Sequence, residues 1–142
     1  MGLDPRIWGP KAWFFLHSVA LNYPKNPTDQ DKQNYKHFFE SIQYILPCPQ
    51  CAKHYGENLQ TNPIQLQSNI DLNKWLVEMH NIVNRHYYKP TITYEQFLDN
   101  YKSIYNGGLQ SDTFNWNHIL IIVVILGLFV GVFMYRQYKK CN

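Results

Sequence analysis

Cysteine is scarce in this chain of 142 residues, which contains Cys48, Cys51 and Cys141 and no others. Three cysteines are too few for a disulfide-rich secreted scaffold. The segment from Met1 to Arg6 lacks the apolar core of a signal peptide, and Arg6 stands where a myristoylation motif needs Ser or Thr. We therefore expect neither a secretory leader nor an N-terminal lipid anchor.

The first 115 residues lack a net charge, because they contain ten Lys and Arg and ten Asp and Glu. The formal charge of +3 comes entirely from Arg136, Lys139 and Lys140, near the C-terminus. A protein that grips a phosphate backbone normally presents a basic surface. We therefore expect no nucleic acid partner.

Strand patterns and internal repeats are also lacking, since no stretch alternates apolar and polar residues at period two. Apolar residues recur instead at helical spacing, and an aromatic content of 16% supports a packed core. The length corresponds to about one domain. The sequence predicts an all-α fold: a four-helix bundle with a short fifth helix, plus one C-terminal transmembrane helix.

Capping signals, prolines and glycines predict the limits of these helices. A capping box begins the second helix at Thr28 and Asp31, and another begins the fifth at Thr93 and Gln96. We expect the first helix to include Trp13 to Ala20 and to end at Tyr23-Pro24, and the second to end before Pro47. The third is expected to span Cys48 to about Gln60. The fourth should begin at Asn69 or Asp71 and end at Lys89-Pro90, and the fifth should end at Gly107-Gly108.

An apolar run without charge, Ile119 to Met134, predicts the transmembrane helix. Trp116 precedes it and Tyr135 follows it, at the positions that interfacial aromatic residues favour. We accordingly divide the chain into a soluble domain at 1–108, a linker at 109–115, a transmembrane helix at 116–135 and a short basic tail at 136–142.

The orientation of this anchor is ambiguous. The basic tail favours a cytoplasmic C-terminus under the positive-inside rule. The missing signal peptide favours a cytoplasmic N-terminal domain, and a tail of about seven residues is easily translocated. We favour the second alternative, a single-pass membrane protein with its soluble domain in the cytoplasm.

Cys48-Pro49-Gln50-Cys51 is the sharpest chemical motif. Two thiols three positions apart can form a small disulfide ring. At a helix start they face exposed N–H groups and the positive end of the helix dipole, which favour the reactive thiolate. Pro49 suits the first turn of a helix, where a missing N–H costs little. The motif therefore predicts redox chemistry.

Three other uses of such a pair fit the sequence less well. A structural zinc site needs four ligands, and His54 adds only a third. Haem attachment needs His directly after the second cysteine, where Ala52 stands. A thioredoxin-like site needs strands around the pair, whereas the flanks here read as helices.

Two groups of polar residues lie beside predicted apolar helix faces. His80, Asn81 and Asn84 share a face of the fourth helix, and His17 lies one turn after Trp13 on the first. Buried polar groups need partners. Taken alone, the His80 row favours an internal network over a bound ligand, and His17 favours a core histidine, although flat rings would suit an aromatic cofactor.

Taken together, these motifs resemble the Erv/ALR family of FAD-linked sulfhydryl oxidases, which includes versions encoded by large DNA viruses. The resemblance spans about Trp8 to Tyr105 and rests on these stretches: Trp8-Gly9-Pro10-Lys11-Ala12-Trp13-Phe14-Phe15-Leu16-His17, Tyr23-Pro24, Pro47-Cys48-Pro49-Gln50-Cys51, His80-Asn81-Ile82-Val83-Asn84-Arg85 and Lys89-Pro90.

The resemblance implies an enzyme whose substrates are protein dithiols or a thioredoxin-like relay protein. The enzyme passes the electrons from these thiols to O2, which gives H2O2. The resemblance also implies a homodimer with non-covalent FAD, in which Cys51 lies next to the flavin and Cys48 faces the substrate. The residues that it implies for the FAD site are Trp13, His17, His80, Asn81, Val83, Asn84 and Lys89.

The chain also departs from the family pattern. No cysteines remain for an extra structural disulfide or for a second, shuttle pair, and Tyr101 and Tyr105 stand where the family often has Trp. Two other readings remain open at this point. One is a zinc-stabilised helical membrane adaptor without catalysis, and the other is a structural membrane protein with a static disulfide.

Overall fold

A computed structural model of the chain describes residues 2–107 and Arg136. Regular structure in this part is helical throughout, with no strand, so the predicted all-α class is confirmed. The helices are α1 (Pro5–Leu21), α2 (Asp29–Ile45), α3 (Pro49–Thr61), α4 (Asn69–His86) and α5 (Tyr94–Asn106). A compact unit ends at Tyr101 and contains α1 to α4 with the first part of α5.

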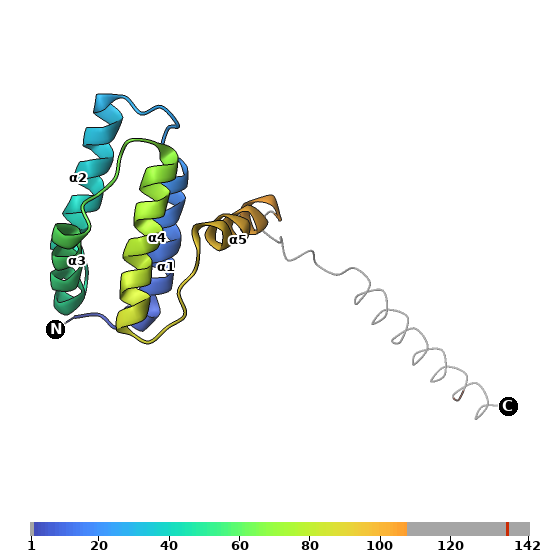
Figure 1. Cartoon of the computed structure of the whole chain (residues 1–142). Helices are drawn as coiled ribbons and strands as arrows, with labels where there is room; N and C mark the ends of the chain where they lie inside the picture. The colour runs from blue at the N-terminus through green and yellow to red at the C-terminus, as the bar shows by residue number, and fades with distance from the viewer. Residues whose placement is uncertain (1, 108–135, 137–142) are drawn as a thin grey trace. The chain divides into compact units, whose positions relative to one another are not determined.

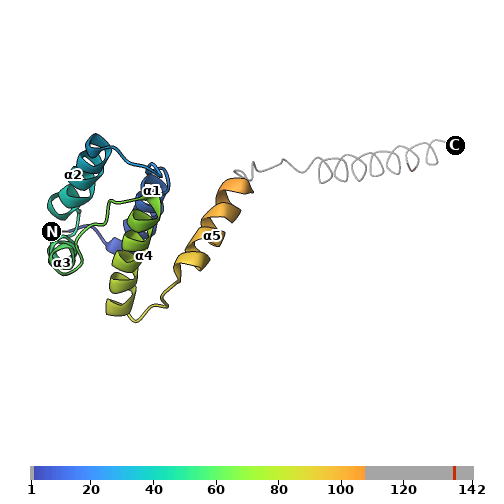
Figure 2. The same ribbon diagram turned by 45° about the horizontal axis from the view of Figure 1, so that its top comes forward.

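The helices of this unit pack in two pairs. The α2 helix lies beside α3, and α1 lies beside α4 (Figure 1). The turned view in Figure 2 shows the same two pairs. This arrangement brings the first helix next to the fourth, although more than forty residues separate them in the sequence. The cysteine pair therefore belongs to the α2–α3 pair, whereas Trp13, His17 and His80 belong to the α1–α4 pair.

Side-chain caps explain where the helices begin. The Thr28 hydroxyl accepts a hydrogen bond from the Asp31 N–H, and the Asp31 carboxylate accepts one from the Thr28 N–H. This is the predicted capping box. Ser68 caps α4 by accepting from the Asp71 N–H. Each bond satisfies an amide that the first turn of a helix leaves without a partner.

The main core joins all four bundle helices. Its buried residues are Leu16, Ala20, Tyr23, Phe39, Ile42, Tyr55, Leu66, Leu72, Trp75, Leu76 and Met79. The Phe39 and Trp75 rings meet edge to face at 5.3 Å between centroids. The Tyr55 hydroxyl donates to the Phe39 carbonyl across 3.0 Å, which ties α3 to α2 through a buried hydrogen bond. Burial of this apolar surface is the main stabilising contribution to the bundle.

A second, smaller core joins α5 to α4. Val77 from α4 packs with Phe97 and Tyr101 from α5, and all three are buried. The segment between the two helices is held by Asn81, whose amide donates to the Ile92 carbonyl at 2.9 Å and accepts from the Ile92 N–H at 3.1 Å. This reciprocal pair fixes how α5 approaches the bundle.

The predicted linker at 109–115 and transmembrane helix at 116–135 lie outside the described residues, and so does the basic tail apart from Arg136. Among the helices of residues 2–107, none is both long enough and apolar enough to cross a bilayer.

Candidate active site

Cys48 and Cys51 form a disulfide at the start of α3. Their Cα atoms are 5.2 Å apart, within the range that a disulfide spans. Cys48 is the N-cap residue in an extended conformation, and its sulfur accepts a hydrogen bond from the Cys51 N–H at 3.2 Å. Pro49 occupies the first turn. The predicted position of the pair at a helix start is confirmed.

This position has a chemical consequence for the reduced pair. The first turn of α3 directs its N–H groups and the positive end of its dipole toward Cys48, which favours a thiolate there. A thiolate is both the better leaving group and the attacking species in disulfide exchange. Both cysteines are half-buried, so a partner can reach the bond at the surface of the bundle.

Two histidines lie near the pair in a contact that spacing alone did not reveal. Gln50 and His54 share a hydrogen bond of 2.7 Å between their side-chain nitrogens, one turn apart on α3. The His54 ring meets the His86 ring edge to face at 5.0 Å between centroids. The middle of α3 thus contacts the C-terminal end of α4.

A second cluster of rings lies between α1 and α4. Trp13 stacks on His80 with ring centroids 4.0 Å apart and planes 5° from parallel. His17 Nε2 lies 3.2 Å from His80 Nδ1, a hydrogen bond in which one nitrogen carries the proton and the other accepts it. The structure thereby brings together three residues that the resemblance assigns to one site.

Both histidines of this cluster are held neutral. Burial, and then the neighbouring His80, lowers the pKa of His17 to about 3. Burial, and then the positive charge of Lys89, lowers the pKa of His80 to about 4. A neutral imidazole has one nitrogen that donates and one that accepts. At neutral pH the pair can therefore form hydrogen bonds with an uncharged polar ring.

One nitrogen of the pair remains available for such a ligand. His17 Nδ1 is buried and has no hydrogen-bond partner among the described residues. Such an atom normally finds a partner. The rings of Phe97 and Tyr101 approach His17 at 4.7 Å and 5.6 Å between centroids. A buried polar nitrogen among flat rings fits a heteroaromatic group such as the isoalloxazine or adenine of FAD.

The remaining residues implied for the FAD site lie further along α4 and beyond it. The Asn81 side-chain amide forms both of its hydrogen bonds with the Ile92 backbone, so it holds the segment between α4 and α5 in place. Val83 and Asn84 are half-buried, and the Asn84 carbonyl accepts the Lys89 N–H at 2.8 Å. Lys89 is exposed, and its charge acts on His80.

Sequence reasoning missed Phe97 as a site residue. Its spacing with Tyr101 placed both on the apolar face of the fifth helix, but no local pattern connects that helix to His17 on the first. The only signal was the family resemblance, which pointed to Tyr101 and Tyr105 near the cofactor rather than to Phe97.

The zinc alternative finds no support in this geometry. Cys48 and Cys51 are bonded to each other and offer no thiolate to a metal. Across residues 2–107 and Arg136, no three His, Cys, Asp or Glu side chains are grouped as a metal site requires.

Comparison with known proteins points to one family. A model of the Erv1/Alr family matches residues 10–102. A probable FAD-linked sulfhydryl oxidase of Acanthamoeba polyphaga mimivirus is 37% identical over 117 residues, which cover 80% of this chain and 81% of the relative. An FAD-linked sulfhydryl oxidase of African swine fever virus is 35% identical over 104 residues, covering 69% of this chain and 79% of the relative.

Cellular relatives are similar over a smaller share of this chain. The mitochondrial FAD-linked sulfhydryl oxidase of Saccharomyces cerevisiae is 42% identical over 87 residues, 61% of this chain but only 46% of the longer yeast protein. The crystal structure of the yeast Erv1 core superimposes with a TM-score of 0.63 at 37% identity, covering 67% of this chain and 80% of that one.

Proposed function

Because the chain belongs to the Erv1/Alr family, we propose that it is a FAD-linked sulfhydryl oxidase that introduces disulfides into protein dithiols and passes the electrons to O2, giving H2O2. The observation that carries this function is the Cys48–Cys51 disulfide at the start of α3, in a bundle that matches the yeast Erv1 core.

The protein's own sulfurs perform the exchange. A substrate thiolate attacks Cys48, its bond to Cys48 forms, and the Cys48–Cys51 bond breaks with the electron pair left on Cys51. The second substrate thiolate then attacks the substrate sulfur of this mixed disulfide and releases Cys48 as a thiolate. The substrate has lost two electrons and gained a disulfide, and the protein pair is reduced.

The helix start assists the exchange in two ways. It stabilises the thiolate that Cys48 becomes when the mixed disulfide is resolved. The Cys51 N–H already donates to the Cys48 sulfur, which orients that sulfur in the oxidised state. We assign Cys48 to the substrate and Cys51 to the cofactor side, as the family resemblance implies.

Bound FAD would supply a two-electron acceptor for the reduced pair and the route from there to O2. We propose that Trp13, His17 and His80 hold its flat ring system through stacking and through the buried Nδ1 of His17. In the same proposal Val83 and Asn84 line the site, Lys89 supplies positive charge toward the phosphates, and Asn81 keeps the neighbouring segment in place.

We further propose a homodimer that is attached to a membrane. Exposed apolar side chains on α1, such as Ile7 and Phe15, support a contact with a second copy. The apolar composition of residues 116–135 supports the membrane anchor, with the catalytic domain on the cytoplasmic side. Protection of a C-terminal tag from protease in sealed membranes tests this orientation, and cleavage of that tag from outside would contradict it.

Cys51→Ser tests the enzymatic assignment. The variant is expected to retain bound flavin but to lose dithiol-dependent oxygen consumption, because the pair can no longer be reoxidised. Oxygen uptake with dithiothreitol and the visible flavin spectrum measure the two properties. Cys141→Ser is the matched control and should keep the wild-type rate. Normal turnover by Cys51→Ser would remove the pair from the mechanism.

A further inference from the structure

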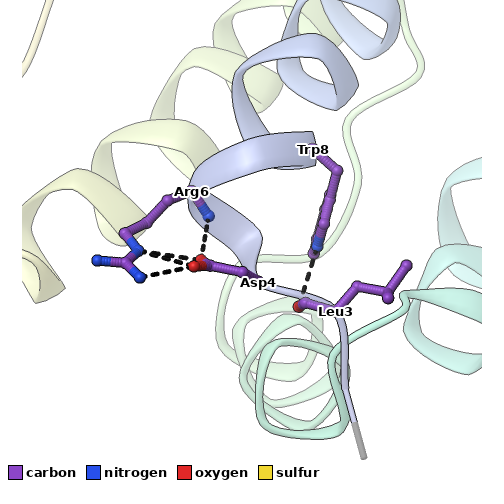
Figure 3. Close-up of polar contacts among 4 residues, drawn as sticks. All are labelled: Leu3, Asp4, Arg6 and Trp8. Carbon is purple, nitrogen blue, oxygen red and sulfur yellow. Dashed lines mark hydrogen bonds and ion pairs between the residues drawn. The ribbon is translucent and has the colours of Figure 1, made fainter.

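Residues 2–4 form a strap that lies against the redox turn at residues 47–51. The Leu3 N–H donates to the Pro47 carbonyl at 2.7 Å, directly before Cys48. The Leu3 carbonyl in turn accepts the Trp8 indole N–H at 3.3 Å, as Figure 3 shows. Both peptide groups of Leu3 are therefore held by the folded domain.

The two ends of the strap also contact the folded domain, at the redox turn and at the start of α1. A Cβ atom added at Gly2 would lie 2.9 Å from Pro49 Cδ, 3.2 Å from Cys48 Cα and 3.3 Å from the Pro47 oxygen. Glycine is thus the residue that lets the backbone approach the turn this closely. At the other end, Asp4 caps α1 by accepting from the Arg6 N–H at 2.9 Å (Figure 3).

The side chain that this strap presents is apolar and exposed. Leu3 is 67% exposed although its backbone is fixed beside Cys48. Ile45, three residues before Cys48 at the end of α2, is 73% exposed. No charged residue occurs from Ser41 to Ala52. Leu3 on the strap and Ile45 just before the turn are therefore exposed apolar side chains next to an uncharged redox turn.

We propose that the strap is part of the thiol-substrate site, with Leu3 as a specificity-determining residue for polypeptide substrates. This inference rests on the proposed oxidase function. An apolar segment next to the substrate cysteines packs on Leu3 while the substrate thiolate attacks Cys48. The glycine at position 2 keeps the strap close enough to the turn for one segment to touch both.

The physical reason is that the backbone of Leu3 loses its conformational entropy when the domain folds, before any substrate binds. A side chain on a tethered backbone loses little freedom when a partner covers it, so most of its apolar burial is available for affinity. Full burial of a leucine is worth roughly 1.5–3 kcal/mol. A small dithiol cannot reach the disulfide and cover Leu3 together, so it gains none of this.

The test compares a polypeptide with a small dithiol in the full-length flavin-loaded chain. Reduced, unfolded ribonuclease A serves as the polypeptide probe and dithiothreitol as the small one, with oxygen uptake as the readout. Leu3→Asp is expected to raise KM for the polypeptide about tenfold, which corresponds to about 1.4 kcal/mol, and to leave kcat and the dithiothreitol rate within about twofold. Ile70→Asp is the matched control, because Ile70 is also apolar and 52% exposed but lies on α4.

A second pair of variants tests the strap itself. Gly2→Ala forces the strap away from Pro49 and Cys48 and should raise KM for the polypeptide severalfold. Gly9→Ala is its control, since a Cβ there meets nothing within 4 Å. The flavin spectrum and melting temperature of each variant report whether it folds.

The outcomes separate the two proposals. Equal losses with both substrates in Leu3→Asp, or no loss with either, would overturn the role of Leu3. Unchanged polypeptide KM in Gly2→Ala would remove the strap from the site. If the wild-type chain oxidises neither probe, the oxidase function itself fails, and the inference fails with it.

Discussion

The protonation state of the two histidines in the ring cluster depends strongly on their surroundings. His17 and His80 hydrogen bond to each other and are both kept neutral by burial. Burial disfavours the charged form of either imidazole, and the nearby His80 and Lys89 add to this effect at His17 and His80 respectively. The pair therefore links the stability of the domain to pH.

The sign of this link follows from the lowered pKa values. Between about 6.5 and the folded values of about 3 and about 4, the unfolded chain binds more protons than the folded one. The stabilisation is complete above pH 6.5 and is lost as the pH falls. Each histidine contributes a slope of up to about 1.4 kcal/mol per pH unit.

Urea unfolding between pH 7.5 and pH 4.5 measures this slope. His17→Leu should have a shallower loss of stability on acidification than the wild type, because one of the two titrating groups is gone. His37→Gln is the control, since His37 is exposed on α2. An unchanged slope in His17→Leu would mean that the buried pair does not govern the acid response.

Tyr88 adopts a backbone conformation that favours glycine. Its φ is 54°, it follows the C-cap residue of α4, and its side chain is 98% exposed. A left-handed conformation costs a non-glycine residue roughly 1–2 kcal/mol, and the exposed ring contributes little packing in return. This position carries local strain beside Lys89.

Tyr88→Gly is therefore expected to raise the free energy of unfolding by up to about 1 kcal/mol, after allowing for the greater freedom of glycine in the unfolded chain. Tyr87→Gly, at a position with φ of −101°, should lower it instead. Thermal and urea unfolding of the two variants provide the comparison, and equal effects would show that Tyr88 is not strained.

At the scale of helices, sequence signals predicted limits well and packing poorly. The Thr28 capping box and Pro47 marked the ends of α2 because both act through neighbouring backbone groups. Ile45 lies three residues after buried Ile42, at the spacing of one helix face, but is exposed in the final turn. Which face of a last turn meets the core depends on the next helix, and local spacing does not contain that information.

The packing of α5 depends on Asn81, which was expected to line a cofactor. Its amide bonds both backbone groups of Ile92 and so orients the segment that leads to Phe97. The partner lies eleven residues away across a turn, and no helical spacing connects the two. Helix spacing identified Asn81 as a residue that needs partners but did not identify them.

Asn81→Ala should lower the free energy of unfolding by about 1 kcal/mol, because it leaves the half-buried N–H and C=O of Ile92 without partners. It should also weaken flavin retention, since Phe97 packs on His17 through the element that Asn81 positions. Asn100→Ala, exposed on α5, is the control. Urea unfolding and dialysis of bound flavin measure the two effects, and full stability of Asn81→Ala would contradict this role.

At the scale of the whole domain, the helical class and the redox pair were predictable from the sequence, whereas the strap was not. The spacing of Cys48 and Cys51 and the flanking prolines are local features. The contact between Gly2 and Cys48 joins residues 46 positions apart and follows only from how the bundle closes. The ring cluster between α1 and α4 is similar, because helical spacing placed its members on two separate helices and the fold brought them together.

The domain thus combines an accessible disulfide at the start of α3 with a neutral aromatic cluster between α1 and α4. In our proposal the first exchanges electrons with thiols, and the second binds the flavin ring. The account depends on electrons passing from one to the other within the same molecule.

Anaerobic titration of the purified full-length chain with dithiothreitol, followed by visible absorbance, tests this transfer most directly. The wild-type protein should show bound flavin that bleaches as two electrons are added beyond those that reduce the disulfide. Cys51→Ser should retain the flavin but bleach far more slowly. A chain that binds no flavin, or flavin that bleaches equally fast without Cys51, would contradict the account.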